Sequence, residues 1–444
     1  MRASVALIAL VAPAAAQTLS ADESGRVMGA FDGIDQIAEK KPDLWPGFDL
    51  AAIPIAVYQP GRSMLLVGHP KPPVGRQYKT HGRVAIWAPA AGECWGVAWA
   101  TVQGHRTACV EMRELLESKQ PVRLLAAAAF AAFAGERIAA PTLEDRLAYD
   151  EDDAANNGAI ELEQRVLDEV IAGDSAGIAD RAREWLGVRA ARLARLPPRA
   201  RKFELQVERS TLTAYVAARA LLGTPVDAEG ADGRLGRLVV GIGRLLDAVR
   251  PGWRDEAFGR IAALEDLVRL SVKGETRKAA EAARLRLAWP LLLDAAERRS
   301  MMAGRERAVL WSQVEAAGGI GVIAVELPAP LPEGARRVDA RGLRRIDGGR
   351  RVWITPVRLD LGARGTLLFW RPVAESLAKN RFAARMPAGL RIMVDDREIP
   401  LGAPLKSAFG RFEVEGEGLR WAIEGGSIDV KNGGVVVHPR GLKD

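Results

Sequence analysis

The period of the hydrophobic pattern changes twice along this chain of 444 residues, which limits the folds that it can adopt. Between 113 and 317, Ala, Leu, Arg and Glu dominate, and apolar residues recur at the spacing of one helix face. Residues 43–112 and 318–444 instead contain short runs of alternating apolar and polar residues, separated by Gly, Pro and Asp. The sequence therefore predicts an α+β protein in three parts. These are a helix plus a small antiparallel β region over 17–112, a mostly helical domain over 113–317, and a β-sandwich-like domain over 318–444.

The N-terminal part begins with a helix signal and continues with strand signals. Ser20 is a suitable N-cap for a helix that runs to about Lys40, because a serine side chain accepts a hydrogen bond from a first-turn amide. A β-hairpin should follow, with Pro60 and Gly61 in its turn. The strands expected here lie near 53–58, 63–68, 83–88, 94–102 and 107–112.

Glycine and proline divide the helical stretch into separate helices, because both residue types disfavour a helix interior. No fixed-period repeat is strong enough to predict a solenoid. The breaks are expected near 135–143, Gly173, Pro197 and Pro198, 223–233, 251–252, 273–274 and Gly304.

Residues 1–16 have the pattern of a secretory signal peptide. Arg2 supplies the positive end, 5–11 the apolar stretch, and three alanines at 14–16 a small-residue cleavage site. The apolar stretch is too short to span a bilayer, and no later segment is long and charge-free enough to do so. A periplasmic or secreted location is therefore predicted, with no transmembrane segment after removal of the signal.

The formal charge of the chain is +7. Outside the cytoplasm, this charge favours an anionic cell-envelope component as partner and gives no reason to expect nucleic acid. The excess is mostly arginine, and 185–202 is a basic helical stretch. Two interpretations of that stretch stay open: a solvated helix face, and a surface for an anionic envelope partner.

Cys94 and Cys109 are the only cysteines of the chain. In an oxidising compartment they can form a disulfide, with two free thiols as the alternative. The four histidines have no partner at helical i+4 spacing and no neighbouring cysteine cluster. We therefore predict no metal and no other cofactor.

Residues 124–137, LLAAAAFAAFAGER, keep two phenylalanines and a Glu-Arg pair around a run of alanines. The segment resembles the active-site helix of secreted bacterial gluzincin-like zinc metallopeptidases, which reads His-Glu-x-x-His. In that family the two histidines bind zinc from one helix face, and the glutamate is the general base. The corresponding positions are held here by Ala127, Ala128 and Ala131.

A second segment, 207–221, resembles the helix that carries the third zinc ligand, a glutamate, in the same family. Ser210 stands at the ligand position, and Tyr215 fits the remaining pattern. Between the two segments, Asn157 and Glu163 fit an intervening helix of such proteins.

The resemblance covers about 25–225 and implies a zincin-like helical domain in which ligands and base have been lost. It also implies that Ala127, Ala131 and Ser210 line one pocket. The alternative is a helix that is rich in alanine only for packing, since alanine has the highest helix propensity and lets neighbouring backbones approach.

The favoured hypothesis is a non-catalytic pseudopeptidase that binds a peptide or a cell-envelope component. One alternative is a hydrolase of another class that uses acidic residues, although Glu161 and Glu163 cannot face the same way on a helix. Another is a non-catalytic structural protein of the envelope. Four aromatic residues of the C-terminal part can form either a core or a glycan-stacking platform; they are Trp353, Phe369, Trp370 and Trp421.

Overall fold

The chain forms two compact units in a computed structural model. The first comprises Met1–Gly135 with Val216–Gly230, and the second comprises Glu136–Tyr215 with Ala231–Asp444. The residues that the structure describes are 20–59, 63–79, 84–89, 94, 98–138, 141–172, 177–221, 233–258, 263–312, 321–331, 335–338, 343–346, 349–401 and 403–440.

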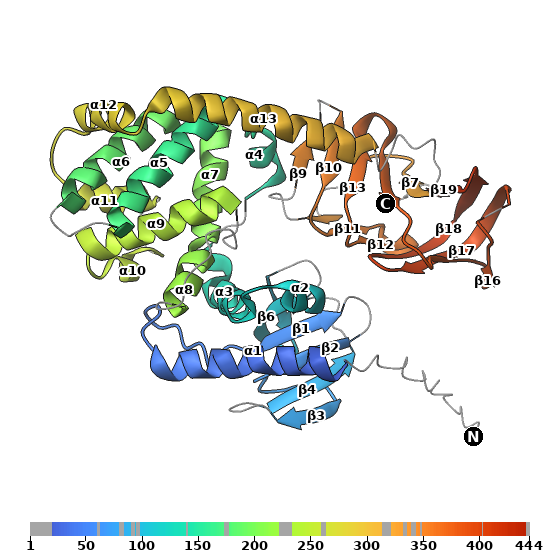
Figure 1. The fold of residues 1–444 in the computed structure, drawn as a ribbon. Helices are drawn as coiled ribbons and strands as arrows, with labels where there is room; N and C mark the ends of the chain where they lie inside the picture. The colour runs from blue at the N-terminus through green and yellow to red at the C-terminus, as the bar shows by residue number, and fades with distance from the viewer. Residues whose placement is uncertain are drawn as a thin grey trace, which may run out of the picture. The chain divides into compact units, whose positions relative to one another are not determined.

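The predicted α+β class is confirmed. A small sheet, a helical region and a many-stranded sheet follow one another along the chain (Figure 1). The helical stretch predicted over 113–317 contributes to both units. The predicted signal peptide over 1–16 and the hairpin turn at Pro60 and Gly61 lie outside the described residues.

Helix α1 (Ala21–Lys40) has the predicted start and length. Ser20 Oγ accepts a hydrogen bond from the Glu23 amide at 3.2 Å, and Glu23 Oε2 accepts one from the Ser20 amide at 2.9 Å. This reciprocal pair satisfies two amides that the first helical turn leaves without partners. Val27, Phe31 and Ile34 are fully buried on one face of α1.

The first sheet has the strand order β3-β4-β2-β1-β6-β5. Its central strands are the apolar ones, since every side chain of β2 is buried and β1 is buried except at its last residue. The strands are β1 (Ile55–Gln59), β2 (Ser63–Val67), β3 (Arg76–Lys79), β4 (Val84–Pro89), β5 (Trp99–Val102) and β6 (His105–Glu111).

One pairing departs from the antiparallel prediction. Strands β5 and β6 form an antiparallel hairpin. Strand β6 also pairs with β1 and runs parallel to β1, with Ile55 opposite Ala108. Strand signals in a sequence identify hairpin neighbours, but they do not reveal which later strand fills a free edge. Strand β3 was also missed, because its sequence RQYK lacks an alternating apolar pattern.

Two helices follow this sheet: α2 (Met112–Glu117) and α3 (Pro121–Ala134). Pro121 is the first residue of α3, where its missing N–H costs no helical hydrogen bond. The helix packs on β5, β6 and α1. It ends at Gly135, whose positive φ of 50° and contact with the Arg106 side chain leave little room for any other residue.

Cys94 and Cys109 are both buried in the first unit. Their Sγ atoms lie 2.6 Å apart as free thiols, with Cys109 on β6. The structure therefore brings the two predicted disulfide partners together, while the covalent bond itself stays a prediction.

We expect the oxidised protein to be more stable than the reduced protein by about 3 kcal/mol, because a bond across this loop restricts the unfolded chain. Urea unfolding of the first unit, followed with and without dithiothreitol, measures the difference. The Cys109→Ala variant is the control, since its stability should not respond to the reductant. Two reactive thiols per chain in protein unfolded without reductant would contradict the prediction.

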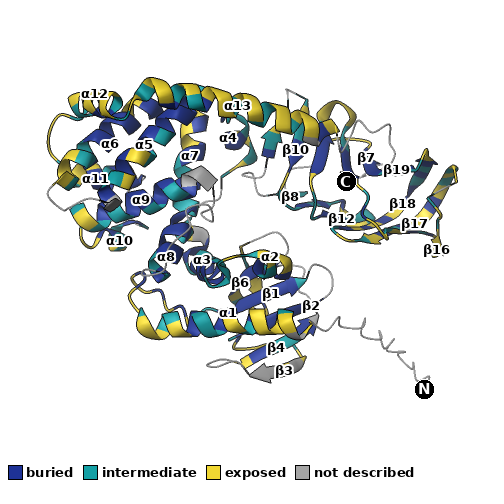
Figure 2. Ribbon diagram, in the orientation of Figure 1, coloured by how far each residue is buried: buried dark blue, intermediate teal, exposed yellow. Residues whose placement is uncertain are grey.

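The helical region of the second unit is built around three helices with buried faces, α5, α6 and α9 (Figure 2). Helix α8 spans the boundary between the units. The elements are the 3₁₀ turn η2 (Gly135–Arg137) and the helices α4 (Leu143–Leu147), α5 (Ala154–Ala172), α6 (Ile178–Leu193), α7 (Pro198–Ser210), α8 (Leu212–Ala220), α9 (Gly233–Val249), α10 (Trp253–Glu256), α11 (Leu264–Ser271), α12 (Thr276–Arg286) and α13 (Trp289–Trp311).

Most of the predicted helix breaks that fall on described residues are confirmed, but the break at Gly304 is wrong. Helix α13 is 23 residues long and is not interrupted at Gly304. A glycine inside a helix costs about 1 kcal/mol, which the packing of α13 along α5 and α12 offsets. The break at Gly173 and nearly all of 223–233 lie outside the described residues. Among the described helices, none has the length and apolar character needed to cross a membrane.

The C-terminal sheet follows the path β16-β15-β17-β18-β19-β7-β14-β13-β10-β9, and β12, β11 and β8 branch from β18. This arrangement agrees with the predicted β-sandwich-like part. The strands are β7 (Val322–Glu326), β8 (Arg336–Val338), β9 (Leu343–Arg345), β10 (Arg350–Trp353), β11 (Val357–Asp360), β12 (Gly365–Phe369), β13 (Val373–Ser376), β14 (Arg381–Arg385), β15 (Arg391–Val394), β16 (Arg397–Glu398), β17 (Leu405–Gly416), β18 (Leu419–Lys431) and β19 (Gly434–Pro439), with 3₁₀ turns η7 (Gly362–Arg364) and η8 (Leu377–Lys379).

The aromatic residues of this part belong to its core. Trp353, Phe369 and Trp421 are at most 1% exposed, and the last two pack with ring centroids 5.1 Å apart. Trp370 is partly buried. The core interpretation is therefore correct, and the glycan-stacking platform is excluded for the three buried rings.

Two helices join the helical region to the C-terminal sheet within the second unit. Trp311, the last residue of α13, packs in a buried cluster with side chains of β7, β10, β13 and β14. From α4, Leu147 packs against the main core of the sheet, and Arg146 donates a hydrogen bond of 2.6 Å to the Leu343 carbonyl.

Candidate functional site

Helix α3 carries the alanine positions that the sequence singled out. Ala127 and Ala131 are partly exposed on one face, one helical turn apart, whereas Ala128 is buried. The face thus presents methyl groups, which neither bind a metal nor transfer a proton.

Aromatic rings pack around the rest of α3. Phe130 lies with its ring centroid 5.0 Å from that of Trp45 and 5.4 Å from that of Phe48. Phe133 lies 5.2 Å from Phe48. The two phenylalanines of the motif are therefore packing residues that hold α3 in the first unit.

Ser210 is the last residue of α7. Its hydroxyl donates to the Val207 carbonyl at 2.8 Å, and the hydroxyl of Thr211 does the same. Ala127 and Ala131 lie in the first unit and Ser210 in the second. The predicted meeting of these three residues in one pocket stays a prediction. Across the described residues, no group of three or more His, Cys, Asp or Glu side chains has the arrangement of a metal site.

A buried cluster of charges lies at the centre of the helical region. We call it the Arg–Glu cluster. Four helices supply it, and all six charged side chains are at least nine-tenths buried. Its members are Glu163 on α5, Arg189 and Arg192 on α6, Glu204 and Glu208 on α7, and Glu265 on α11.

Arg192 joins α5 to α7. Its Nε lies 2.5 Å from Glu163 Oε1, and its Nη1 lies 2.5 Å from Glu204 Oε2. The side chain of Asn156 supports the arrangement by accepting from Arg192 Nη1 at 3.0 Å and donating to the Tyr149 hydroxyl at 3.0 Å. Arg192 therefore has charged partners on both sides, as a buried cation requires.

Arg189 joins the same helices to α11. Its guanidinium lies 2.7 Å from Glu265, 2.5 Å from Glu208 and 3.3 Å from Glu163. Arg189 and Arg192 are three residues apart on α6, so both project from the same side of that helix. A guanidinium offers five N–H donors in a fixed plane, which suits it to several carboxylates at once.

The carboxylates of the cluster outnumber its guanidinium groups. Arg201 and Arg269 also approach Glu265, at 4.0 Å and 3.6 Å, and so offset its charge from the surface side. Among the remaining groups, burial raises the pKa of Glu208, although the charge of Arg189 opposes that rise.

This cluster was not predicted from the sequence. The prediction that the charges of 185–202 face solvent or a partner is wrong for Arg189 and Arg192, because both are fully buried. A signal was available: these arginines follow Trp185 and Val188 at the spacing of the apolar stripe, so they share its buried face.

The predictions for α5 were partly correct. Glu161 pairs with Arg165 and Arg299 near the surface, while Glu163 is buried, so the two face different ways as expected. The resemblance pointed to Asn157, but the cluster uses its neighbour Asn156.

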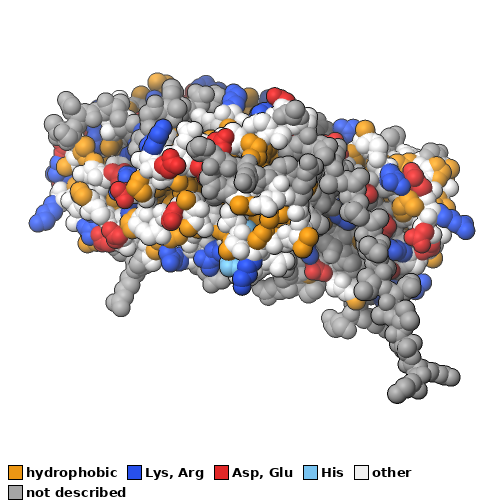
Figure 3. All heavy atoms as spheres, turned by 90° about the horizontal axis from the view of Figure 1, so that it is seen from below, with side chains coloured by type: hydrophobic (Ala, Val, Ile, Leu, Met, Phe, Trp, Pro, Cys, Tyr) orange, Lys and Arg blue, Asp and Glu red, His pale blue; other side chains and the backbone are white. Residues whose placement is uncertain are grey.

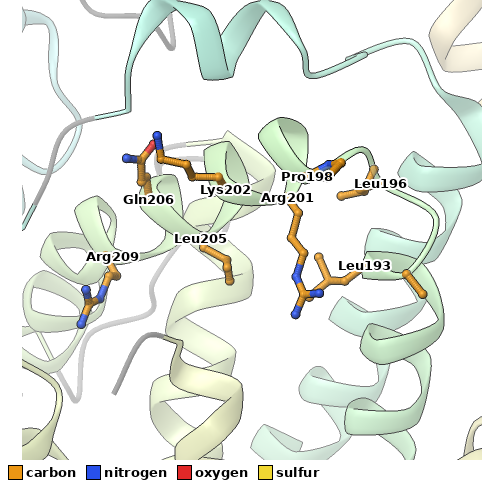
Figure 4. A pocket seen from close by; sticks show the side chains of 9 residues that line it. Leu193, Leu196, Pro198, Arg201, Lys202, Leu205, Gln206 and Arg209 are labelled. Atoms are coloured by element: carbon orange, nitrogen blue, oxygen red, sulfur yellow. The ribbon is translucent and has the colours of Figure 1, made fainter. Parts of the chain in front are cut away.

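A pocket of about 530 Å³ opens beside the end of α6 and the outer side of α7. Leu193, Leu196 and Leu205 give it apolar walls, and three cationic residues border it. In Figure 4, Arg201, Leu205 and Arg209 project toward the same side of α7. Helix α7 thus presents Glu204 and Glu208 to the interior and cations to the pocket.

Comparisons with known proteins give no further guide to the site. No family model, no curated protein and no solved structure matches the chain.

Proposed function

We propose that this chain is an exported, non-catalytic binding protein, periplasmic or secreted, that binds a peptide or an anionic cell-envelope component. The observation that carries the proposal is the face of α3. Ala127 and Ala131 are partly exposed at the positions that the resemblance assigns to zinc ligands, and Phe130 and Phe133 pack against each other on the same helix. A helix that keeps its packing residues but carries methyl groups at the ligand positions is suited to binding without catalysis.

The buried carboxylates support the same proposal over a hydrolase of another class. A general acid or base must reach the substrate. Glu163 and Glu204 are instead fully buried and engaged by Arg192 at 2.5 Å. These groups hold helices together.

The pocket beside α7 favours a binding role over a purely structural one. A pocket of a few hundred cubic ångströms with apolar walls and a few polar groups is typical of ligand sites. On the molecular face drawn in Figure 3, cationic and anionic side chains are interspersed. A local site is therefore a better basis for recognition than a general surface charge.

The proposal is tested by placing histidines at the two partly exposed positions of α3. We expect the Ala127→His, Ala131→His variant to bind zinc in a one-to-one ratio, because two histidines one turn apart on a helix face can share one metal ion. The unchanged protein should retain no stoichiometric zinc and should not cleave peptides. Zinc content after dialysis and a peptidase assay measure both.

The matched control carries one histidine, Ala131→His, and it should bind zinc at least about tenfold more weakly. Equal affinity of the two variants would show that positions 127 and 131 do not share one metal ion. Zinc-dependent proteolysis by the unchanged protein would overturn the proposed function itself.

A further inference from the structure

Helix α13 carries a row of apolar side chains that point into solvent. Four large hydrophobic residues of this helix are 54% to 69% exposed: Leu291, Met301, Met302 and Val309. Leu291, Met302 and Val309 follow one another at intervals close to three and two helical turns, so they lie on one side of the helix. That side is exposed along most of α13 (Figure 2). Contiguous exposed apolar groups on a folded protein mark an interaction surface.

Two charged residues on the same helix have no ion-pair partner among the residues that the structure describes. They are Arg305 and Glu306, and both are exposed. The helix itself cannot supply a partner, because the residues three and four positions from each of them are Met, Ala, Val or Leu. Arg298, in contrast, lies 2.8 Å from Asp294, whose side chain is still 53% exposed. Arg305 is therefore a cation beside the apolar row that is available to an anion from outside.

We propose that α13 is the contact surface of a dimer, in which it packs antiparallel against α13 of a second copy of this chain. The apolar row is symmetric about Ser300, since Leu291 and Val309 are equally far from it along the helix. A two-fold axis near Ser300 places Leu291 beside Val309 of the second copy, and the two rows then meet over about 27 Å. Antiparallel helices with interlocking side chains pack about 8–10 Å apart. This surface is separate from the proposed binding site.

The same arrangement supplies the missing ion pairs. Asp294 is six residues before Ser300 and Arg305 is five residues after it, so each Asp294 comes beside Arg305 of the second copy. Asp294 is three residues after Leu291, and Arg305 is four residues before Val309, which places both on the same flank of the row. The two-fold symmetry forms this pair twice.

Other occupants fit this surface less well. A parallel pair of helices would place Arg305 beside Arg305 of the second copy, and like charges at a contact are unfavourable. An anionic membrane surface attracts helices whose polar face is rich in Lys and Arg. Helix α13 instead exposes three acidic residues as well, Asp294, Glu297 and Glu306. A second copy can use both signs of charge.

Sedimentation equilibrium of the full chain measures the dimer. We expect the unchanged chain to be mostly dimeric at about 10 µM. Asp294→Arg and Arg305→Glu should each raise the dissociation constant at least about tenfold, because each variant puts two like-charged pairs into the contact. Circular dichroism checks that both variants are folded.

The most specific sample is an equal mixture of these two variants. In a heterodimer of Asp294→Arg with Arg305→Glu, both contacts again join an arginine to a carboxylate. The mixture should therefore dimerise within about threefold of the unchanged chain, although each variant alone does not. The matched control is Arg277→Glu on α12, which makes the same charge change at a side chain that is 87% exposed. It should change the dissociation constant less than about twofold.

A chain that stays monomeric at about 100 µM would overturn the dimer. A dimer that Arg305→Glu leaves intact, or a mixture of the two variants that stays monomeric, would overturn the antiparallel pairing. Binding of a monomeric chain to anionic phospholipid vesicles, abolished by Met302→Glu, would assign the surface to a lipid instead. None of these results involves α3 or peptide binding, so failure of this inference is distinct from failure of the proposed function.

Discussion

Replacing Arg192 with leucine is expected to lower the free energy of unfolding of the second unit by about 3–5 kcal/mol. The guanidinium is fully buried and lies 2.5 Å from both Glu163 and Glu204. Its loss leaves two carboxylates in the interior with fewer partners, and a buried charge without compensation is strongly unfavourable. Urea unfolding followed by circular dichroism measures the change.

The control for this variant is Arg195→Leu, which removes the same side chain from an exposed position three residues further along the chain, just after the end of α6. It should alter stability by less than about 0.5 kcal/mol. Arg192→Lys should also be destabilising, because a single ammonium group cannot reproduce the planar fork that contacts both glutamates. If Arg192→Leu is as stable as the unchanged protein, the Arg–Glu cluster is not needed to hold the helices together.

The spacing of apolar residues predicted the overall fold, because the residues on the buried face recur about every 3.6 positions in a helix and every two positions in a strand. Helix α1 starts after Ser20 and ends at Lys40, as expected. Its start was predictable because a capping box depends on residues close in sequence. Pairings between distant segments carry no such local signal. The parallel pair with Ile55 opposite Ala108, and the continuation of α13 through Gly304, follow from packing that the sequence pattern does not express.

The candidate site was less predictable for a related reason. A charged residue is normally solvated, so Arg189 and Arg192 were assigned to a surface. Their burial depends on carboxylates from α5, α7 and α11, and the fold is needed to bring those partners together. The pocket depends likewise on the corner between α6 and α7, although the basic stretch that borders it was recognised.

Replacing Gly187 with alanine is expected to destabilise the second unit by about 1–3 kcal/mol, within the usual cost of overpacking. Helix α6 lies so close to α12 that a Cβ atom at Gly187 would be 2.1 Å from the Thr276 carbonyl oxygen and 2.9 Å from the Ala280 Cβ. A backbone carbonyl cannot rotate away as a flexible side chain can. The two helices must therefore separate, and thermal unfolding should record the loss.

The sign of this effect separates packing from helix propensity. Alanine favours a helix over glycine by up to about 1 kcal/mol, so propensity alone predicts that Gly187→Ala is stabilising. Gly29→Ala on α1 is the matched control, because a Cβ there meets nothing within 4 Å and the propensity gain should appear unopposed. If both variants are stabilised, α6 and α12 are not in close contact. If Gly187→Ala alone is destabilised, that contact holds α6, and with it Arg189 and Arg192, against the carboxylates of the Arg–Glu cluster.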